Sequence, residues 1–146
     1  MRYIGLDLGT KTLGISISDE TKTIASPLTV LRFSENNNEE VLDELKEIVK
    51  EFNVEKIILG LPKNMNNTVG DRALATIDFQ KKLSLLFNIE VVLQDERLST
   101  VAAHNYLLEA NMSRKKRKNV VDKMAANIIL QTYLDKEKGM LKWTKN

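Results

Sequence analysis

The sequence contains no cysteine, so disulfide bonds and zinc sites built from thiolates are excluded. It contains one histidine, His104, which is expected to pack or to face solvent. Neither a histidine-based catalytic triad nor a metal site with several histidines is therefore expected. Any metal ion must then be held by oxygen ligands, which favours Mg²⁺ or Mn²⁺.

Long apolar runs are absent as well. No segment reaches the length of a membrane span, and charges as early as Arg2 and Asp7 argue against a signal peptide. Together with the lack of cysteine, this predicts a cytoplasmic protein with no membrane partner. At 146 residues the chain has the length of one domain. We expect that domain to span residues 1–138 and residues 139–146 to form a loose tail.

The first nineteen residues, MRYIGLDLGTKTLGISISD, contain the most informative pattern. Alternation over residues 3–8 predicts a strand that is covered on both faces. Asp7 lies in this strand with Gly5 on the same face, and a buried carboxylate needs hydrogen bonds, a cation or a metal. Residues 13–18 alternate in the same way and predict a second strand, which forms a hairpin with the first.

Three interpretations of Asp7 are open at this point. It could hold a divalent metal in a nuclease of ribonuclease H type. The run DLGTKT could instead be the phosphate hairpin of an actin-like or sugar-kinase nucleotide site, or Asp7 could be structural, in a salt bridge or a turn cap. The length of the chain argues against the nucleotide site, because actin-like enzymes close two such domains over the nucleotide.

Strands and helices alternate along the rest of the chain. Pro27 interrupts the third apolar run, which predicts an edge strand or a bulge. Asn38 is a candidate helix N-cap, and Asn53 and Asn88 are candidate left-handed helix ends. The order predicts an α/β, ribonuclease H-like fold, in which a five-stranded mixed sheet has helices on both faces. The further strands are expected at 23–32, 56–61 and 90–94, and the helices at 39–52, 71–87, 99 or 100 to 110, and 120–138.

Three carboxylates are expected at one edge of this sheet. Asp7 lies late in the first strand and Glu96 lies just past the last one, and ligands collect at the carboxyl ends of parallel strands. Asp122 begins a helical stripe, continued by Ala126, that should pack on the sheet. Each acid also has an ordinary structural role available, such as pairing with Arg97 for Glu96 or helix-dipole interaction for Asp122. Three converging carboxylates suit one or two magnesium ions.

A basic run, RKKRK at residues 114–118, comes shortly before Asp122. Removing its five charges from the net charge of +2 leaves −3, so the remainder of the chain is mildly acidic. A local basic cluster on such a body indicates a docking point for phosphates, and a solvated loop that aids solubility is the alternative. We expect the run to lie in a loop and to bring a phosphodiester backbone to the acidic edge.

Four motifs resemble the YqgF (RuvX-like) family. They are GLDLGTKTLGISISD at 5–19, GLPKNMNNTVG at 60–70, DERLST at 95–100 and SRKKRKNVVDKMAANIILQTYLD at 113–135. Members of this family are described as Holliday junction resolvases and as nucleases of precursor 16S ribosomal RNA. The resemblance implies a ribonuclease H-like fold and a cytoplasmic bacterial metal-dependent nuclease. It also implies that Asp7, Glu96 and Asp122 are the catalytic and metal-binding residues.

The sequence departs from the family pattern at Thr12, where many members have arginine, and at Asn67, where glycine is frequent. Classical ribonuclease H enzymes also place an acid at the end of the fourth strand, where this chain has Gly60, Leu61 and Pro62.

We therefore expect a Mg²⁺- or Mn²⁺-dependent hydrolase that cleaves phosphodiester bonds in the maturation of precursor 16S ribosomal RNA, as a monomer or a homodimer. A Holliday junction resolvase acting on DNA and a non-catalytic nucleic-acid-binding regulator are the alternatives. The residues expected to contact nucleic acid are Lys11, Lys63, Asn64, Arg97, Arg114, Lys115, Lys116, Arg117, Lys118 and Lys123.

Overall fold

The computed structural model describes residues 1–62, 70–95 and 114–139, with side chains from residue 124 onward in the last segment. Five strands form one mixed sheet in the order β3-β2-β1-β4-β5. The predicted sheet is thus confirmed, with an antiparallel meander of three strands followed by two strands parallel to the first. The strands are β1 (Arg2–Leu8), β2 (Thr12–Ser18), β3 (Ala25–Arg32), β4 (Val54–Leu61) and β5 (Glu90–Asp95).

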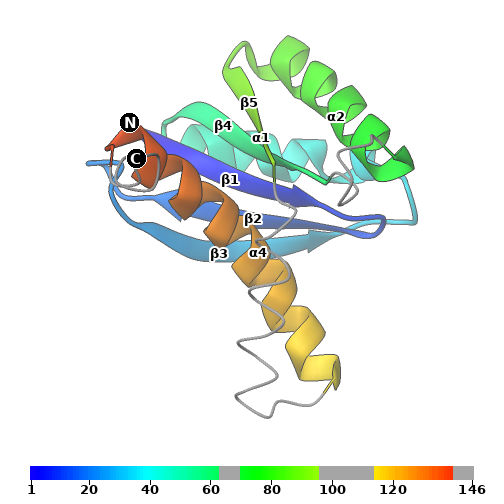
Figure 1. The fold of residues 1–146 in the computed structure, drawn as a ribbon. Helices are drawn as coiled ribbons and strands as arrows, with labels where there is room; N and C mark the ends of the chain where they lie inside the picture. The colour runs from blue at the N-terminus through cyan, green and yellow to red at the C-terminus, as the bar shows by residue number, and fades with distance from the viewer. Residues whose placement is uncertain (63–69, 96–113, 140–146) are drawn as a thin grey trace.

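Helices cover both faces of the sheet, as predicted (Figure 1). The short 3₁₀ helix η1 (Asn38–Val41), α1 (Leu42–Glu51) and α2 (Asp71–Phe87) lie on one face, and α4 (Arg114–Glu137) crosses the other. The alternation of β1 supplies both cores: Ile4 and Leu6 pack on the α1 and α2 side, and Tyr3 packs on the α4 side. Within the described ranges, none of the helices has the length and apolar character needed to cross a membrane.

Several local predictions are confirmed. Asn53 and Asn88 both adopt a positive φ of 52°; Asn88 is the C-cap of α2 and Asn53 follows Phe52, the C-cap of α1. Helix α2 begins and ends at the predicted residues. Asparagine tolerates this left-handed conformation better than most residues do. Pro27 lies in the edge strand β3, beside a shift of register opposite Ile15 and Ser16. An edge position suits proline because it has no N–H to donate to a neighbouring strand.

The predicted helix at 39–52 is divided, and the predicted N-cap is wrong. Its first turn is η1, and the α-helix begins only at Leu42. The residue at the N-cap of η1 is Asn37, which makes no side-chain capping bond. Asn38 Oδ1 instead accepts a hydrogen bond from Lys82 Nζ of α2 at 3.1 Å. A partner distant in the sequence therefore occupies the oxygen that the local pattern assigned to the cap.

The basic run is helical and not a loop. Residues 114–118 form the first turns of α4, whereas the sequence pattern placed the helix start at Val120. Lysine and arginine are good helix formers, and this propensity outweighs repulsion among the like charges. In Figure 1 the N-terminal half of α4, coloured yellow, extends beyond the sheet. The helix predicted near 100–110 and the tail at 140–146 lie outside the described residues.

Candidate active site at the carboxyl edge of the sheet

Asp7 lies near the end of β1, partly buried, on the face that α4 crosses. Its register partner on β2 is Gly14. On the other side of β1, Leu6 is in register with Leu59, so Gly60 comes next to Asp7 on β4. Cross-strand neighbours on one face lie side by side, and both of these neighbours of Asp7 are glycines, which carry no side chain.

Three contacts determine the register of α4 on β1. The rings of Tyr133 and Tyr3 meet edge to face with their centroids 6.0 Å apart. Earlier in the helix, Leu130 and Ala126 approach Gly5 so closely that a Cβ at this glycine would lie 2.7 Å from Leu130 Cβ and 2.9 Å from the Ala126 carbonyl oxygen. Higher residue numbers on α4 thus meet lower numbers on β1, and the helix runs antiparallel to the strand.

This register points the N-terminal part of α4, which contains Asp122, toward the Asp7 end of β1. From Gly5 to Asp7 the strand advances about 6.6 Å, and from Ala126 back to Asp122 the crossing helix advances about 6 Å along its own axis. Ser16 of β2 holds the two elements together, since its buried Oγ donates a hydrogen bond to the Ala126 carbonyl oxygen at 2.8 Å. The predicted close approach of α4 at Ala126, which is fully buried, is confirmed.

β5 brings a further polar side chain to this edge. Gly60 is in register with Gln94, so Asp7, Gly60 and Gln94 form one row across three parallel strands. Gln94 is buried, and sequence reasoning missed it. Its alternation with Val92, which packs on the α4 side, indicates that it faces α4. Glu96 comes two residues later in the sequence and lies outside the described residues.

Of the predicted metal-binding set, only the Asp7 side chain lies among the described residues, and its carboxylate is an oxygen ligand of the kind that a hard divalent cation takes. Among the described side chains, no group of three His, Cys, Asp or Glu could by itself hold a metal ion. What the described residues provide is the Asp7 carboxylate between two glycines, the neutral oxygen of Gln94 in the same row and the nearby backbone of Asp122. Oxygen donors of this kind suit Mg²⁺ or Mn²⁺.

Lys11 lies in the β1–β2 turn, which is held by three backbone hydrogen bonds. Gly9 N donates to Thr12 O at 2.8 Å, Phe33 N donates to Lys11 O at 2.9 Å, and Asn36 N donates to Thr10 O at 2.7 Å. The Lys11 side chain is exposed at the end of β1 that also holds Asp7. Of the other predicted nucleic-acid contacts, Lys63, Asn64 and Arg97 lie outside the described residues, and Arg114, Lys115, Lys116, Arg117, Lys118 and Lys123 are described only as backbone of α4.

Arg72, the second residue of α2, is a candidate that sequence reasoning missed. Its Nη2 donates a hydrogen bond to the carbonyl oxygen of Leu8 at 3.2 Å, and Leu8 directly follows Asp7. Arg72 therefore lies at the same edge of the sheet. The feature of the sequence that could have revealed Arg72 is its position in the first turn of a predicted helix, where the helix dipole disfavours positive charge.

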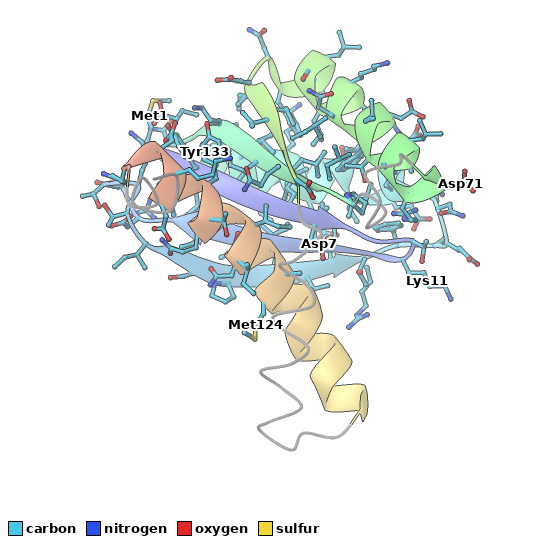
Figure 2. The ribbon with its side chains drawn as sticks, in the orientation of Figure 1. Met1, Asp7, Lys11, Asp71, Met124 and Tyr133 are labelled. Carbon is cyan, nitrogen blue, oxygen red and sulfur yellow. The ribbon has the colours of Figure 1, made fainter. Side chains whose placement is uncertain are left out.

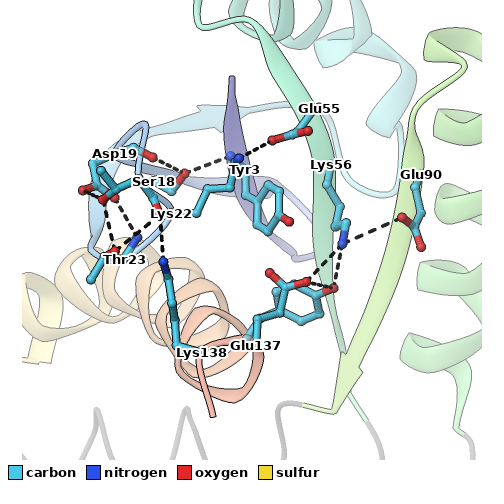
Figure 3. Close-up of polar contacts among 12 residues, drawn as sticks. Tyr3, Ser18, Asp19, Lys22, Thr23, Glu55, Lys56, Glu90, Glu137 and Lys138 are labelled. Carbon is cyan, nitrogen blue, oxygen red and sulfur yellow. Dashed lines mark hydrogen bonds and ion pairs between the residues drawn. The ribbon is translucent and has the colours of Figure 1, made fainter. Parts of the chain in front are cut away.

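A second polar cluster lies at the opposite end of the sheet and fixes the C-terminal end of α4 (Figure 3). Lys56 Nζ donates hydrogen bonds to Tyr133 Oη at 3.0 Å and to Glu137 Oε2 at 3.3 Å. It also lies 4.9 Å from the centre of the Tyr3 ring, within range of a cation–π interaction. Burial lowers the pKa of Lys56, but the hydrogen bonds to Tyr133 and Glu137 outweigh it, so the net pKa is raised.

Known proteins match the chain over most of its length. The family model described as "RuvX: Holliday junction resolvase" matches residues 1–136. A protein of Bacillus mycoides (strain KBAB4) named "Putative pre-16S rRNA nuclease" is 51% identical over 135 residues, which are 92% of this chain and 98% of that one. The protein of the same name from Bacillus subtilis (strain 168) is 50% identical over 135 residues, with the same coverage.

Among solved structures, T. thermophilus RuvC in complex with a Holliday junction substrate has a TM-score of 0.57 at 14% identity. The match covers 95% of this chain and 97% of that chain, and at this identity it bears on the fold alone. It confirms the predicted ribonuclease H-like architecture. With the family model matching residues 1–136 and relatives about half identical, the chain belongs to the RuvX family of Holliday junction resolvase-type nucleases.

Proposed function

We propose that this nuclease cleaves precursor 16S ribosomal RNA at an acidic site formed by Asp7, Glu96 and Asp122. The observation that supports the proposal is the antiparallel register of α4 on β1, because it points the part of α4 that contains Asp122 toward the end of the strand that contains Asp7. The choice of substrate is supported by the names of the Bacillus relatives, which match this chain over nearly their full length.

The three acids would together hold Mg²⁺ or Mn²⁺. Such an ion supplies positive charge that stabilises the charge developing on the scissile phosphate. Asp7 is the fixed point of the site, since β1 is a central strand paired on both sides. Asp122 is held relative to it by the contacts of Gly5 and Ser16 with α4. Gln94, in the same row as Asp7, offers an amide that can donate a hydrogen bond to a phosphate oxygen.

The basic start of α4 would bind the RNA backbone. Arg114 precedes Asp122 by eight positions, so along the helix axis the run begins about 12 Å from the acid. Cations at a helix N-terminus are opposed by the helix dipole, and a bound phosphate would remove this conflict. Contacts of this kind position a backbone without reading its sequence.

A Holliday junction resolvase is the second candidate, and the description of the family favours it. Paired cuts in a four-way junction need two sites related by symmetry, so this activity predicts a stable homodimer. A non-catalytic regulator is the third. It predicts nucleic-acid binding that survives the substitution Asp7→Asn, with no cleavage by either form.

Cleavage of end-labelled precursor 16S ribosomal RNA and of a four-way DNA junction, measured side by side, tests these alternatives. Each substrate is incubated with Mg²⁺, with Mn²⁺ and with chelator. Asp7→Asn keeps the shape of the side chain and removes its charge, and it should lower the rate on the order of 10²-fold or more. Asp78→Asn makes the same change at an exposed position of α2 and should leave the rate unchanged.

Cleavage of the RNA alone, lost with chelator and with Asp7→Asn, is the expected result. Paired cuts in the junction by a dimer would transfer the assignment to the resolvase. Tight binding without cleavage of either substrate by the wild-type protein would refute the catalytic proposal and support the regulator.

A further inference from the structure

Arg72 lies at the acidic edge, on the face of the sheet opposite to α4. Its guanidinium donates a hydrogen bond to the Leu8 carbonyl oxygen at 3.2 Å, and it approaches from α2, which packs on the other core of the sheet. Figure 2 shows Asp71, the first residue of α2, and Lys11, in the β1–β2 turn, at the same end of the molecule. Two cationic side chains are therefore near the end of β1, neither of them on α4.

The charge of Arg72 is not neutralised within the part of the chain that the structure describes. The ion pairs found there involve Arg2, Lys22, Lys56 and Lys82, and none involves Arg72. Its hydrogen-bond partner among the described residues is a neutral carbonyl group, and its position in the first turn of α2 is electrostatically unfavourable for a cation. The only acidic residue in that turn is Asp71, which is exposed.

The chemistry of the guanidinium indicates which ligand would resolve this conflict. Arginine has five N–H donors in a planar fork, and among the described residues only one bond, to Leu8, uses them. The fork matches two oxygens of a phosphate, and such charge-assisted pairs are stronger than neutral hydrogen bonds. Arg72 is partly exposed, so the remaining donors can reach a ligand from solvent. The bond to Leu8 would hold the fork in place beside the residue that follows Asp7.

We infer that Arg72, together with Lys11, binds a phosphate group of the nucleic-acid backbone on the α2 side of the scissile bond. This inference rests on the proposed function, because it assumes that the scissile phosphate lies at Asp7. The basic start of α4 would then bind the backbone on one side of the acids, and Arg72 would bind it on the other. The nucleic acid would cross the edge of the sheet from one face to the other.

The salt dependence of binding separates a phosphate contact from a structural role. Binding is measured in the Asp7→Asn background, so that the probe is not cut, with a single-stranded precursor 16S ribosomal RNA fragment over a range of KCl concentrations. Each phosphate contact with a single strand contributes about 0.7 to the slope of log K against log salt. Arg72→Gln should reduce the slope by about this amount. The loss of affinity caused by the substitution should therefore be about fivefold larger at 0.1 M salt than at 1 M salt.

Two further variants make the measurement specific. Lys81→Gln removes one charge at an exposed position of the same helix, more than two turns away, and should leave the slope unchanged. Arg72→Lys keeps the charge but lacks the planar set of guanidinium donors. It should therefore keep the slope and bind more weakly than the parent, which is the Asp7→Asn protein with Arg72 intact. This second comparison stands if Arg72→Gln fails to fold, which thermal unfolding reports.

The same titration is run on the four-way DNA junction, so that the contact is measured on whichever nucleic acid binds. A slope lowered by Arg72→Gln and not by Lys81→Gln, on either probe, supports the contact. Equal slopes in the parent and in Arg72→Gln, binding of neither probe, or equal affinities in the parent and Arg72→Lys would overturn it. Cleavage by the wild-type protein tests the proposed function separately, so the phosphate contact of Arg72 and the proposed function can each be refuted without the other.

Discussion

The contact between Gly5 and α4 predicts a large effect from the smallest possible substitution, Gly5→Ala. The added Cβ would lie 2.7 Å from Leu130 Cβ and 2.9 Å from the Ala126 carbonyl oxygen, and closer still to the Ser16 hydroxyl. Carbon atoms pack best at about 3.5–4.0 Å, so α4 would have to move away from β1 by roughly 1 Å. The atoms that oppose the methyl group are helix backbone, a helix Cβ and a buried hydroxyl, none of which can rotate freely away.

The expected loss follows from this movement. Inserting a methyl group into a packed core costs about 1–3 kcal/mol. Lengthening the hydrogen bond from Ser16 to Ala126, now 2.8 Å, adds about 1 kcal/mol. We therefore expect the free energy of unfolding to fall by about 2–4 kcal/mol. A shift of roughly 1 Å in a catalytic group can also lower the rate by about 10²-fold.

Urea denaturation followed by circular dichroism measures the stability, and Gly9→Ala is the matched control. A Cβ at Gly9 would lie 3.1 Å from Thr12 Oγ1, the end of a side chain that can rotate. This control should change the free energy of unfolding by less than about 0.5 kcal/mol. If Gly5→Ala were as stable as Gly9→Ala, the close approach of α4 to β1 would be wrong, and with it the register that points Asp122 toward the Asp7 end of the strand.

Two further predictions concern the polar contacts far from the acids. Tyr133→Phe removes an acceptor of Lys56 and should lower the free energy of unfolding by about 1 kcal/mol. The double variant with Lys56→Met should lose less than the sum of the single losses in urea denaturation, and additive losses would show that the pair is not coupled. The Thr21 hydroxyl and nearby backbone amides lower the pKa of Asp19 from 3.8 to about 2. The associated stability is present above pH 3.8 and is lost toward pH 2, so Asp19→Asn should flatten the pH dependence of unfolding there, and an unchanged profile would contradict this.

The central strands could be predicted from the sequence because their pattern is local. In β1, Ile4 and Leu6 pack in one core while Tyr3 packs in the other, as the period of two requires. Asp7 and Gly5 share a face for the same reason. The ends of α2 could also be predicted, because an acidic first residue and a left-handed asparagine mark them within a single turn.

The features that could not be predicted depend on partners distant in the sequence. Asn38 binds Lys82, 44 residues away, and Arg72 binds Leu8, 64 residues away. No local pattern contains these pairs. The helical start of α4 is a different case, since the sequence analysis placed residues 114–118 in a loop although their helix propensity is high.

In the candidate site, too, the local features could be predicted from the sequence and the contacts between distant residues could not. Helical spacing predicted which face of α4 would carry Asp122, and that face does pack on the sheet at Ala126. Spacing alone could not predict which strand the helix crosses or in which register. That is decided by Ser16 and Ala126, which are 110 residues apart, and by the absence of a side chain at Gly5.

The arrangement of α4 gives Gly5→Ala a second consequence, which concerns binding. The helix is held to β1 near Asp122 and to Lys56 at its C-terminal end, while its basic N-terminal half extends beyond the sheet. Lifting the helix at Gly5 should displace Asp122 from Asp7 but leave residues 114–118 on the same exposed helix. Cleavage should therefore fall much more than the affinity for RNA. If the cleavage rate and the affinity for RNA fell equally, the basic run and Asp122 would not have separate roles, and α4 would bind RNA only when it is packed on β1.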